Sequence, residues 1–126
     1  MSTHNDVVAR AKEITAREMA VYAERTKRSQ TATDRARKVM PARVASSFQA
    51  YDPWPVVVKH SAGARMVDVD DNEYVDYDMG FGALYAGHMN PIIRKAVIEQ
   101  LDHGTLYVTP CELNADVGEL LAERYN

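Results

Sequence analysis

Apolar residues recur at helical spacing in the first part of the chain. Residues 6–27 are strong helix formers, and the helix that they predict carries an apolar stripe. The stripe consists of Val7, Ala11, Ile14 and Val21. The polar run 29–33 predicts a break, with Thr33 as the N-cap of a short second helix that ends near Met40, since Pro41 disfavours helix in the residue before it. The pattern therefore predicts an exposed, helical beginning.

The middle of the chain changes to a strand pattern. The Asp-Pro-Trp-Pro stretch at 52–55 enforces an extended backbone, and β-branched residues follow at 56–60. Polar and apolar residues then alternate over 65–69 and again over 73–77. Turn-forming residues fill the two gaps, at 61–63 and at 70–72. The pattern predicts a meander of three short antiparallel strands.

Two further helices are predicted near the carboxyl end. Asn90 begins the first as its N-cap, with Pro91 at the first helical position, and Gly104 ends it. Thr109 begins the second in a capping box with Glu112. Their apolar faces consist of Ile93, Ala96, Val97 and Leu101, and of Leu113, Val117, Leu120 and Leu121. Because one small sheet cannot cover two such faces, we expect the chain to be the beginning of a larger protein.

Composition narrows the class of protein and its partners. A chain of 126 residues with 46% hydrophobic and 26% charged residues is typical of one soluble globular domain or part of one. The formal charge of -3 comes from interspersed acids and bases, so neither nucleic acid nor a membrane surface is expected as a partner. No apolar stretch approaches the roughly 20 residues of a membrane span. Residues 1–6 show no secretory pattern, and a cytoplasmic location is expected.

Two motifs suggest a calcium-binding loop and a phosphate-binding loop, but the spacing of their residues fits neither. Residues 68–72 imitate the start of an EF-hand loop, but Glu73 and Met79 stand where glycine and glutamate are required. We interpret them as a hairpin turn. The glycines between 80 and 87 match no phosphate-binding motif, and we interpret them as turn residues.

The histidines and the cysteine do not form a metal-binding pattern. His60, His88 and His103 are widely spaced, so no metal site is predicted. Cys111 lies at the predicted start of a helix and is interpreted as a half-buried residue rather than a reactive thiol. Five aromatic residues in or beside loops either line a pocket or cover the sheet, and the pattern leaves both open. They are Tyr51, Trp54, Phe81, Tyr85 and Tyr107.

Five sequence blocks, taken together, resemble a known family. They are Arg-Lys-Val-Met-Pro at 37–41, the strand-turn-strand stretch at 67–77, Gly-His-Met-Asn-Pro at 87–91, Gly-Thr at 104–105 and the predicted helix at 112–123. In this order and spacing, residues 35–125 resemble class III aminotransferases, especially the branch with glutamate-1-semialdehyde aminomutase and the β-amino-acid aminotransferases. The stretch at 52–55 is more similar to the β-amino-acid aminotransferases than to the aminomutase.

The resemblance implies an α+β segment of a fold type I transferase that depends on pyridoxal 5'-phosphate (PLP). It implies a helical region at 1–40, a small three-stranded antiparallel sheet with a substrate loop at 41–88, and helices at 89–126 that lead into a large PLP-binding domain. The cofactor lysine, the aspartate that pairs with the pyridine nitrogen and the Ser-Gly-Thr phosphate loop are expected downstream of Asn126. The chain alone is therefore expected to be inactive, and the complete enzyme to be a homodimer.

The resemblance also assigns candidate site residues. Substrate contacts are expected from Ser46, Gln49, Tyr51 and Phe81. The active-site entrance or dimer interface is expected at Gly104, Thr105 and Tyr107. The lysines match no cofactor lysine; they are Lys12, Lys27, Lys38, Lys59 and Lys95. No catalytic residue is assigned within the chain.

Two departures from the family pattern bear on the substrate. Relatives often place an arginine in the loop after Met-Pro to grip a carboxylate in a bidentate ion pair, but Ser46 and Gln49 hold those positions. Arg43 is nearby but shifted, which makes recognition of a carboxylate by this loop doubtful. Asp71 replaces the glycine that is usual in the hairpin turn.

The expected activity is transfer of an amino group between an amino compound and a carbonyl acceptor, both small molecules. One alternative is an aminomutase of the glutamate-1-semialdehyde type, which moves an amino group within one molecule. A second alternative is a non-catalytic interaction module or truncated remnant, which the lack of catalytic groups favours.

Overall fold

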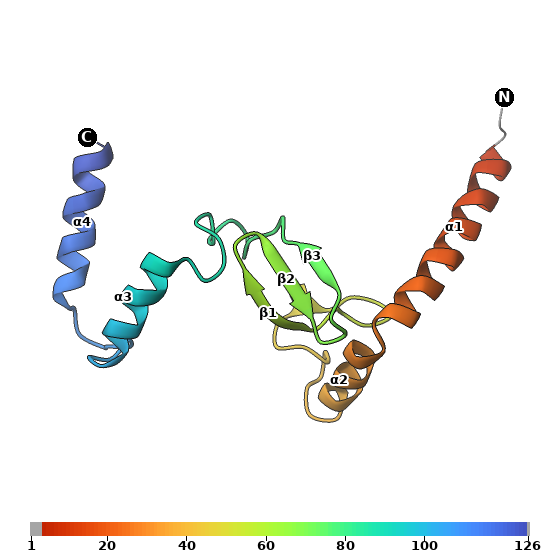
Figure 1. Cartoon of the computed structure of the whole chain (residues 1–126), viewed down its shortest axis with the longest axis horizontal. Helices are drawn as coiled ribbons and strands as arrows, with labels where there is room; N and C mark the ends of the chain where they lie inside the picture. The colour runs from red at the N-terminus through yellow and green to blue at the C-terminus, as the bar shows by residue number, and fades with distance from the viewer. Residues whose placement is uncertain (1–3, 126) are drawn as a thin grey trace. The chain divides into compact units, whose positions relative to one another are not determined.

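The computed structural model of the chain describes residues 4–125 and divides into two compact units, Met1–Met89 and Asn90–Asn126 (Figure 1). The first unit contains two helices, a short 3₁₀-helix and a sheet, and the second contains two helices. This composition confirms the predicted α+β class. The division into regions 1–40, 41–88 and 89–126 stays a prediction.

The predicted three-stranded antiparallel meander is confirmed. Its strands are β1 (Val58–Ala62), β2 (Arg65–Asp68) and β3 (Glu73–Val75), in the order β1-β2-β3. The prediction placed the first strand two residues too early, because the chain turns at 63–64 rather than at 61–63. Gly63 adopts a φ of 56°, which glycine reaches without strain, so Ala62 can pair directly with Arg65.

The break between the first two helices was predicted at the wrong place. Helix α1 spans His4–Arg25 and α2 spans Lys27–Arg37, so the break lies at Thr26. Thr33 is a buried residue inside α2, where its hydroxyl donates to the Ser29 carbonyl oxygen at 2.9 Å, and it is not an N-cap. Thr31 likewise donates to the Lys27 carbonyl oxygen at 3.0 Å, so both hydroxyls are satisfied within the helix.

A distant carboxylate explains where α2 begins. Asp70, in the turn between β2 and β3, accepts hydrogen bonds from the backbone N–H of Arg28 at 2.6 Å and of Ser29 at 2.9 Å. Thr26, at the N-cap position, makes no side-chain capping bond. Asp70 thus satisfies amide groups that the helix cannot satisfy itself, and it does so from 41 or more residues away in sequence.

The interior of the first unit is polar. Among residues 4–125 no hydrophobic side chain is fully buried, whereas Thr26, Ser29, Thr33 and Asp68 are at most 3% exposed. Asp68 accepts from the backbone N–H of Asp70 at 2.9 Å and from the Tyr74 hydroxyl at 2.9 Å. The sheet turn and the α1–α2 junction are therefore held by hydrogen bonds rather than by an apolar core.

The second unit contains α3 (Pro91–Leu101) and α4 (Glu112–Tyr125). Asn90 caps α3 as predicted, since its side-chain oxygen accepts from the backbone N–H of Ile92 and Ile93. Helix α4 begins three residues after the predicted cap Thr109, because the Asn114 side chain turns back and accepts from the Cys111 backbone N–H at 2.9 Å. Cys111 rather than Thr109 therefore precedes the helix, in place of the predicted capping box.

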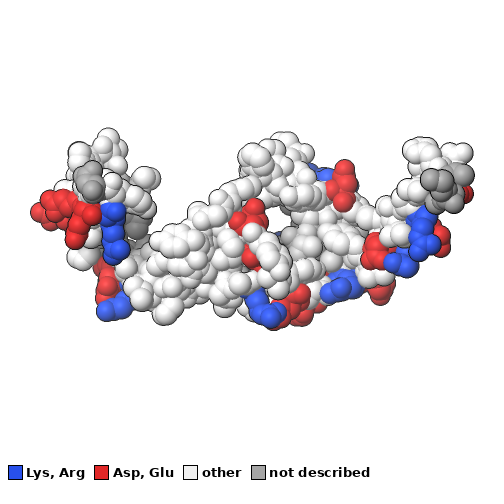
Figure 2. Space-filling view, turned by 90° about the horizontal axis from the view of Figure 1, so that it is seen from above, with Lys and Arg blue, Asp and Glu red and all other residues white. Residues whose placement is uncertain are grey.

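The apolar faces of both helices in the second unit are exposed. Leu113, Val117, Leu120 and Leu121, which the sequence pattern placed on a buried face, are 49%, 52%, 60% and 53% exposed. On the face drawn in Figure 2, acidic and basic residues are interspersed rather than gathered by sign. Within residues 4–125 no helix is both long and apolar enough to cross a membrane.

Candidate functional site

An open groove lies in the first unit, between the loop before β1 and the loop after β3. Its volume is about 1020 Å³, just above the roughly 300–1,000 Å³ of small-molecule sites. Its aromatic wall consists of Tyr22, Phe48, Tyr51, Trp54 and Phe81. The remaining lining residues are Val44, Ser46, Gln49, Asp52, residues 55–58, Asp78 and Gly80. All four predicted substrate residues thus line one groove, and their contact with substrate stays a prediction.

A short 3₁₀-helix, η1 (Ser47–Gln49), forms one rim of the groove. Ser46 precedes it in an extended conformation, and its carbonyl oxygen accepts from the Gln49 backbone N–H at 2.9 Å. The tight turn brings Ser46, Phe48 and Gln49 to the same groove. Phe48 packs edge-on against Phe81, with ring centroids 5.6 Å apart. This ring contact joins η1 to the loop after β3.

Trp54 is fixed by Tyr22 of α1 and by Thr26 at the junction of α1 and α2. Its indole N–H donates to the Thr26 hydroxyl at 2.9 Å, and its carbonyl oxygen accepts from the Tyr22 hydroxyl at 2.5 Å. The Tyr22 and Trp54 rings lie 5.9 Å apart. Burial, followed by the charge of Asp68, raises the pKa of Tyr22, although the hydrogen bond with Thr26 lowers it. A neutral Tyr22 therefore holds the groove wall against α1 over the usual pH range.

The loop that carries Phe81 has a strained backbone. Met79 and Phe81 adopt left-handed φ angles of 47° and 57°, which bulky residues rarely occupy. Gly80 and Gly82, at 61° and 83°, confirm the interpretation of these glycines as turn residues. Asp78 accepts from the Phe81 backbone N–H at 3.2 Å. Such strain, roughly 1–3 kcal/mol a residue, tends to occur at functional sites.

An aspartate–histidine pair closes the base of this loop. Asp76 accepts from the backbone N–H of Asp78 and Met79, each at 2.9 Å, and its second oxygen lies 2.7 Å from His88 Nε2. These bonds, led by the one from Met79, lower the pKa of Asp76. His88 and Gly63 also exchange backbone hydrogen bonds of 2.8 and 2.9 Å. His88 therefore has a structural role, as the sequence interpretation allowed.

Arg43 is held by the loop that it belongs to. Its guanidinium donates to the Pro53 carbonyl oxygen at 2.9 Å and to Asp52 Oδ1 at 3.2 Å, and its side chain is 21% exposed. Asp52 lines the groove, but Arg43 does not. The one arginine that the sequence placed near the substrate loop therefore faces a carboxylate of its own chain.

The described residues do not fit the chemistry of holding PLP. None of the five lysines lines the groove, and the Lys59 ammonium is 2.7 Å from Asp71. The groove also lacks a Ser/Thr-rich turn at the start of a helix of phosphate-binding length, since η1 has three residues. Across 4–125 no group of three His, Cys, Asp or Glu side chains gathers as metal ligands. The groove therefore presents aromatic and polar side chains but no lysine.

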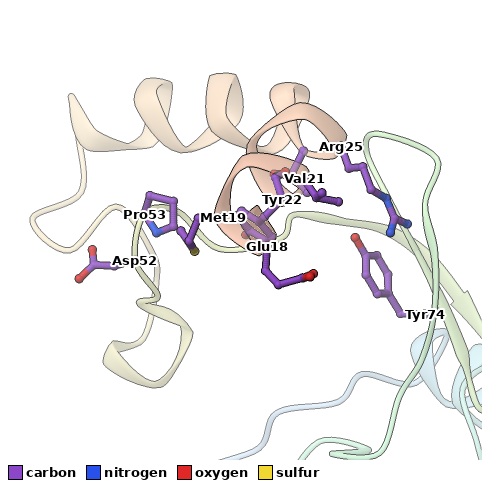
Figure 3. Close-up of a pocket in the computed structure, with 9 residues that line it drawn as sticks. Glu18, Met19, Val21, Tyr22, Arg25, Asp52, Pro53 and Tyr74 are labelled. Atoms are coloured by element: carbon purple, nitrogen blue, oxygen red, sulfur yellow. The ribbon is translucent and has the colours of Figure 1, made fainter. Parts of the chain in front are cut away.

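A second, smaller pocket of about 350 Å³ lies beside α1. Figure 3 shows Arg25 and Tyr74 on one side of it and Asp52 and Pro53 on the other. Its polar groups are engaged within the fold: the Arg25 guanidinium donates to Asn72 Oδ1, and the Tyr74 hydroxyl donates to Asp68. We interpret this pocket as structural.

The predicted entrance residues lie in the second unit, between α3 and α4. Gly104 adopts a φ of 95°, and the Tyr107 hydroxyl lies 2.9 Å from the Gly104 carbonyl oxygen. A Cβ at position 104 would come within 3.1 Å of that hydroxyl. Thr105 is exposed. Gly104, Thr105 and Tyr107 therefore share one connecting segment, and their role at an entrance or dimer interface stays a prediction.

Sequence reasoning found part of the aromatic wall and missed the rest. Tyr51, Trp54 and Phe81 line the groove, whereas Tyr85 and Tyr107 do not. Phe48 was overlooked although it lies between two predicted contacts, so its place in the loop was an available signal. Tyr22 gave no such signal, because its place in the groove wall depends on how α1 meets the loop that carries Trp54.

Comparison with known proteins identifies relatives of this arrangement. The model of the family "Aminotransferase class-III" matches residues 46–123. A glutamate-1-semialdehyde 2,1-aminomutase of Methanococcoides burtonii is 45% identical over 92 residues, which cover 73% of this chain and 22% of that protein.

Two solved structures share the fold. A glutamate-1-semialdehyde aminomutase from Pseudomonas aeruginosa PAO1 has a TM-score of 0.85 at 28% identity, with 94% of this chain and 26% of that chain covered. A variant of it was solved in complex with PMP. A β-phenylalanine aminotransferase from Variovorax paradoxus has a TM-score of 0.82 at 26% identity, with 90% and 26% covered. The chain thus spans about a quarter of the length of these relatives or less.

Proposed function

This chain belongs to the class III aminotransferase family, and we propose that it supplies one wall of the substrate site in a PLP-dependent enzyme that transfers an amino group to a carbonyl acceptor. The family is PLP-dependent. Since the chain corresponds to only 22–26% of its relatives, the chemical step belongs to residues outside it.

One observation carries the proposal. Ser46, Gln49, Tyr51 and Phe81, which the family resemblance marks as substrate contacts, line a single groove although they come from two separate loops. The Phe48–Phe81 ring contact and the Asp76–His88 pair hold those loops in place. Rigid side chains of this kind position a substrate before it reacts. In cofactor enzymes, orienting the substrate against the cofactor is a main contribution of the protein.

The chain's own contribution is binding and shape. PLP, when bound by such an enzyme, acts as an electron sink for the bonds that change. No lysine of this chain lines the groove to anchor it. The aromatic wall excludes water from one side of the substrate, and the neutral polar groups of Ser46 and Gln49 are suited to orient it.

An aminomutase is the second candidate. The support for it is that a glutamate-1-semialdehyde 2,1-aminomutase is 45% identical over 92 residues. An aminomutase needs one substrate, whereas a transaminase needs an amino donor and a separate acceptor. Product formation from a single substrate by the longest protein that the gene encodes would favour the aminomutase.

The test is an absorbance spectrum with PLP, recorded before and after borohydride reduction. It compares the 126-residue chain with the longest protein that its gene encodes. We expect a reducible Schiff-base band in the longer protein only, because the groove lacks a lysine. Absence of the band from both proteins contradicts the proposal and favours a non-catalytic interaction module.

A further inference from the structure

We propose that Asp76 and His88 are positioning residues, which set the place of the Phe81 ring in the groove wall although neither of them lines the groove. This inference rests on the proposed function, because it concerns how one wall of the proposed substrate site is held. The two residues would act on a substrate only through Phe81.

Both ends of the loop that carries Phe81 are attached to the turn between β1 and β2. The Asp76 backbone N–H donates to the Ala64 carbonyl oxygen at 2.9 Å. His88, twelve residues further along, exchanges backbone hydrogen bonds of 2.8 and 2.9 Å with Gly63. The 2.7 Å contact between Asp76 Oδ2 and His88 Nε2 joins the two ends directly. The loop is therefore closed at its base and held by the sheet.

The Asp76 carboxylate also sets the backbone that leads to Phe81. Its Oδ1 accepts from the backbone N–H of Asp78 and of Met79, each at 2.9 Å. Met79 and Phe81 have left-handed φ angles of 47° and 57°. Such angles persist only where the surrounding contacts impose them. One oxygen of Asp76 thus holds the bend at Met79 while the other binds His88.

The Phe81 ring depends on this backbone because burial does not fix it. The ring is 79% exposed, and its ring contact is with Phe48, which is itself 72% exposed. The side chains of Asp76 and His88, by contrast, are only 11% and 19% exposed. A hydrogen bond that is shielded from water in this way is stronger than an exposed one. The ring therefore lies where the closed loop directs it.

The pair also gives a role to two sequence blocks that the proposed function leaves unused. Asp76 belongs to the strand-turn-strand block at 67–77, and His88 belongs to the Gly-His-Met-Asn-Pro block at 87–91. The fold brings the two blocks together at this contact. An apolar pair could fill the same space, but it could not both join the loop ends and accept hydrogen bonds from the loop backbone.

The test is nuclear magnetic resonance of the full 126-residue chain, which contains only two phenylalanines. Labelling phenylalanine alone isolates the nuclear Overhauser effect between the Phe48 and Phe81 rings, whose centroids are 5.6 Å apart. We expect His88→Leu, which keeps bulk but has no donor, to lose this effect while the backbone signals of β2 and β3 are unchanged. His88→Gln should retain it, because its amide can donate to Asp76.

His60→Leu is the matched control, since His60 lies on β1 of the same unit and is exposed, and it should leave the effect unchanged. Amide hydrogen exchange of the unaltered chain is a second measurement that needs no variant. The Met79 N–H, which Asp76 binds, should be protected about as strongly as the His88 N–H, which Gly63 binds.

Three results would overturn the inference. They are an undiminished effect in His88→Leu with the sheet intact, an equal loss in His88→Leu and His88→Gln, and a Met79 amide that exchanges as fast as an exposed loop amide. Neither measurement needs PLP, so both are independent of the Schiff-base test. The expected losses without any Schiff-base band would remove the proposed function alone, whereas a Schiff-base band with any of the three results would remove this inference alone.

Discussion

Asp70 stands in a turn between two strands, yet it controls the start of a helix. Besides the two backbone N–H groups, its carboxylate accepts from the Ser29 hydroxyl at 2.8 Å. Burial raises the pKa of Asp70, but the bonds from Arg28 and Ser29 outweigh it, and the pKa lies below its usual value. The carboxylate is therefore ionised, and a good acceptor, throughout the neutral range.

We expect Asp70→Ala to lower the free energy of unfolding by about 1–2 kcal/mol, as loss of an N-cap does. Urea unfolding followed by circular dichroism measures this. Asp71→Asn is the control for loss of a neighbouring charge: its left-handed φ of 66° suits asparagine equally, and it removes only exposed ion pairs with Lys59 and Arg28, so a smaller loss is expected. A loss for Asp71→Asn as large as that for Asp70→Ala would contradict the assignment of Asp70 as the cap.

Tyr74 makes the unit sensitive to alkali. Burial, the hydrogen bond to Asp68 and the charge of Asp68 raise the pKa of Tyr74 from 10.0 to about 12. Above about pH 10 the unfolded chain loses this proton while the folded chain keeps it, so unfolding is favoured. The stability contributed by the neutral hydroxyl is complete below pH 10.0 and is lost as pH rises toward about 12.

Tyr74→Phe should therefore be less stable at neutral pH, by roughly 1–3 kcal/mol, because Asp68 loses a donor. Its stability should also fall less steeply between about pH 10 and 12 than that of the parent chain. Urea titrations at several pH values measure both. Tyr77→Phe is the control, because Tyr77 is 92% exposed, and an identical pH dependence for both variants would refute the explanation.

At the scale of elements, the loop after β3 depends on the close approach of two glycines. Gly87 has a φ of 84°, and a Cβ there would come within 3.3 Å of the Gly63 backbone. Gly63 also has a positive φ, but a Cβ there would meet nothing within 4 Å. A side chain at either position therefore strains the backbone, but only a side chain at Gly87 also collides with a neighbour.

Alanine at either glycine should cost about 1–2 kcal/mol for the left-handed backbone. Gly87→Ala should cost more than Gly63→Ala, since it also pushes apart the backbone pairing of Gly63 with His88. Thermal unfolding of the two variants side by side measures the difference. Equal melting temperatures would mean that the loop relaxes freely and that it does not hold Phe81 in place.

At the scale of the whole molecule, apolar side chains lie on the surface. Within residues 4–125 no hydrophobic residue is fully buried, and the apolar face of α4 is about half exposed or more. Monomeric proteins rarely leave continuous faces of this kind uncovered. The faces suit packing against further protein, such as the large domain or second subunit expected from the family.

We expect the chain alone to bind a hydrophobic dye and to associate as its concentration rises. Sedimentation velocity over a range of concentrations measures the association. Val117→Lys together with Leu120→Lys should reduce both effects without loss of helix, because both positions are exposed. Monomeric behaviour at every concentration, with no dye bound, would show that these faces do not drive self-association.

What the sequence determined by itself was local. Periodicity, proline and turn residues identified three strands, four helices and the Asn90 cap, because these depend on neighbours within a few residues. The family resemblance assigned substrate contacts to Ser46, Gln49, Tyr51 and Phe81, since the order and spacing of sequence motifs identify a family. Thr33 and Thr109 were misplaced as caps, because local propensity alone offered several equivalent starts.

Only the tertiary structure decided what depends on residues far apart in the chain. Helix α2 begins earlier than predicted because Asp70 accepts hydrogen bonds from its first amide groups. Tyr22 lies in the groove wall because it contacts Trp54. The tertiary structure also shows that Arg43 is paired with Asp52, which no spacing predicts. Hydrogen bonds and ion pairs across 9 to 42 residues are set by how the elements pack, and packing is not encoded in any local pattern.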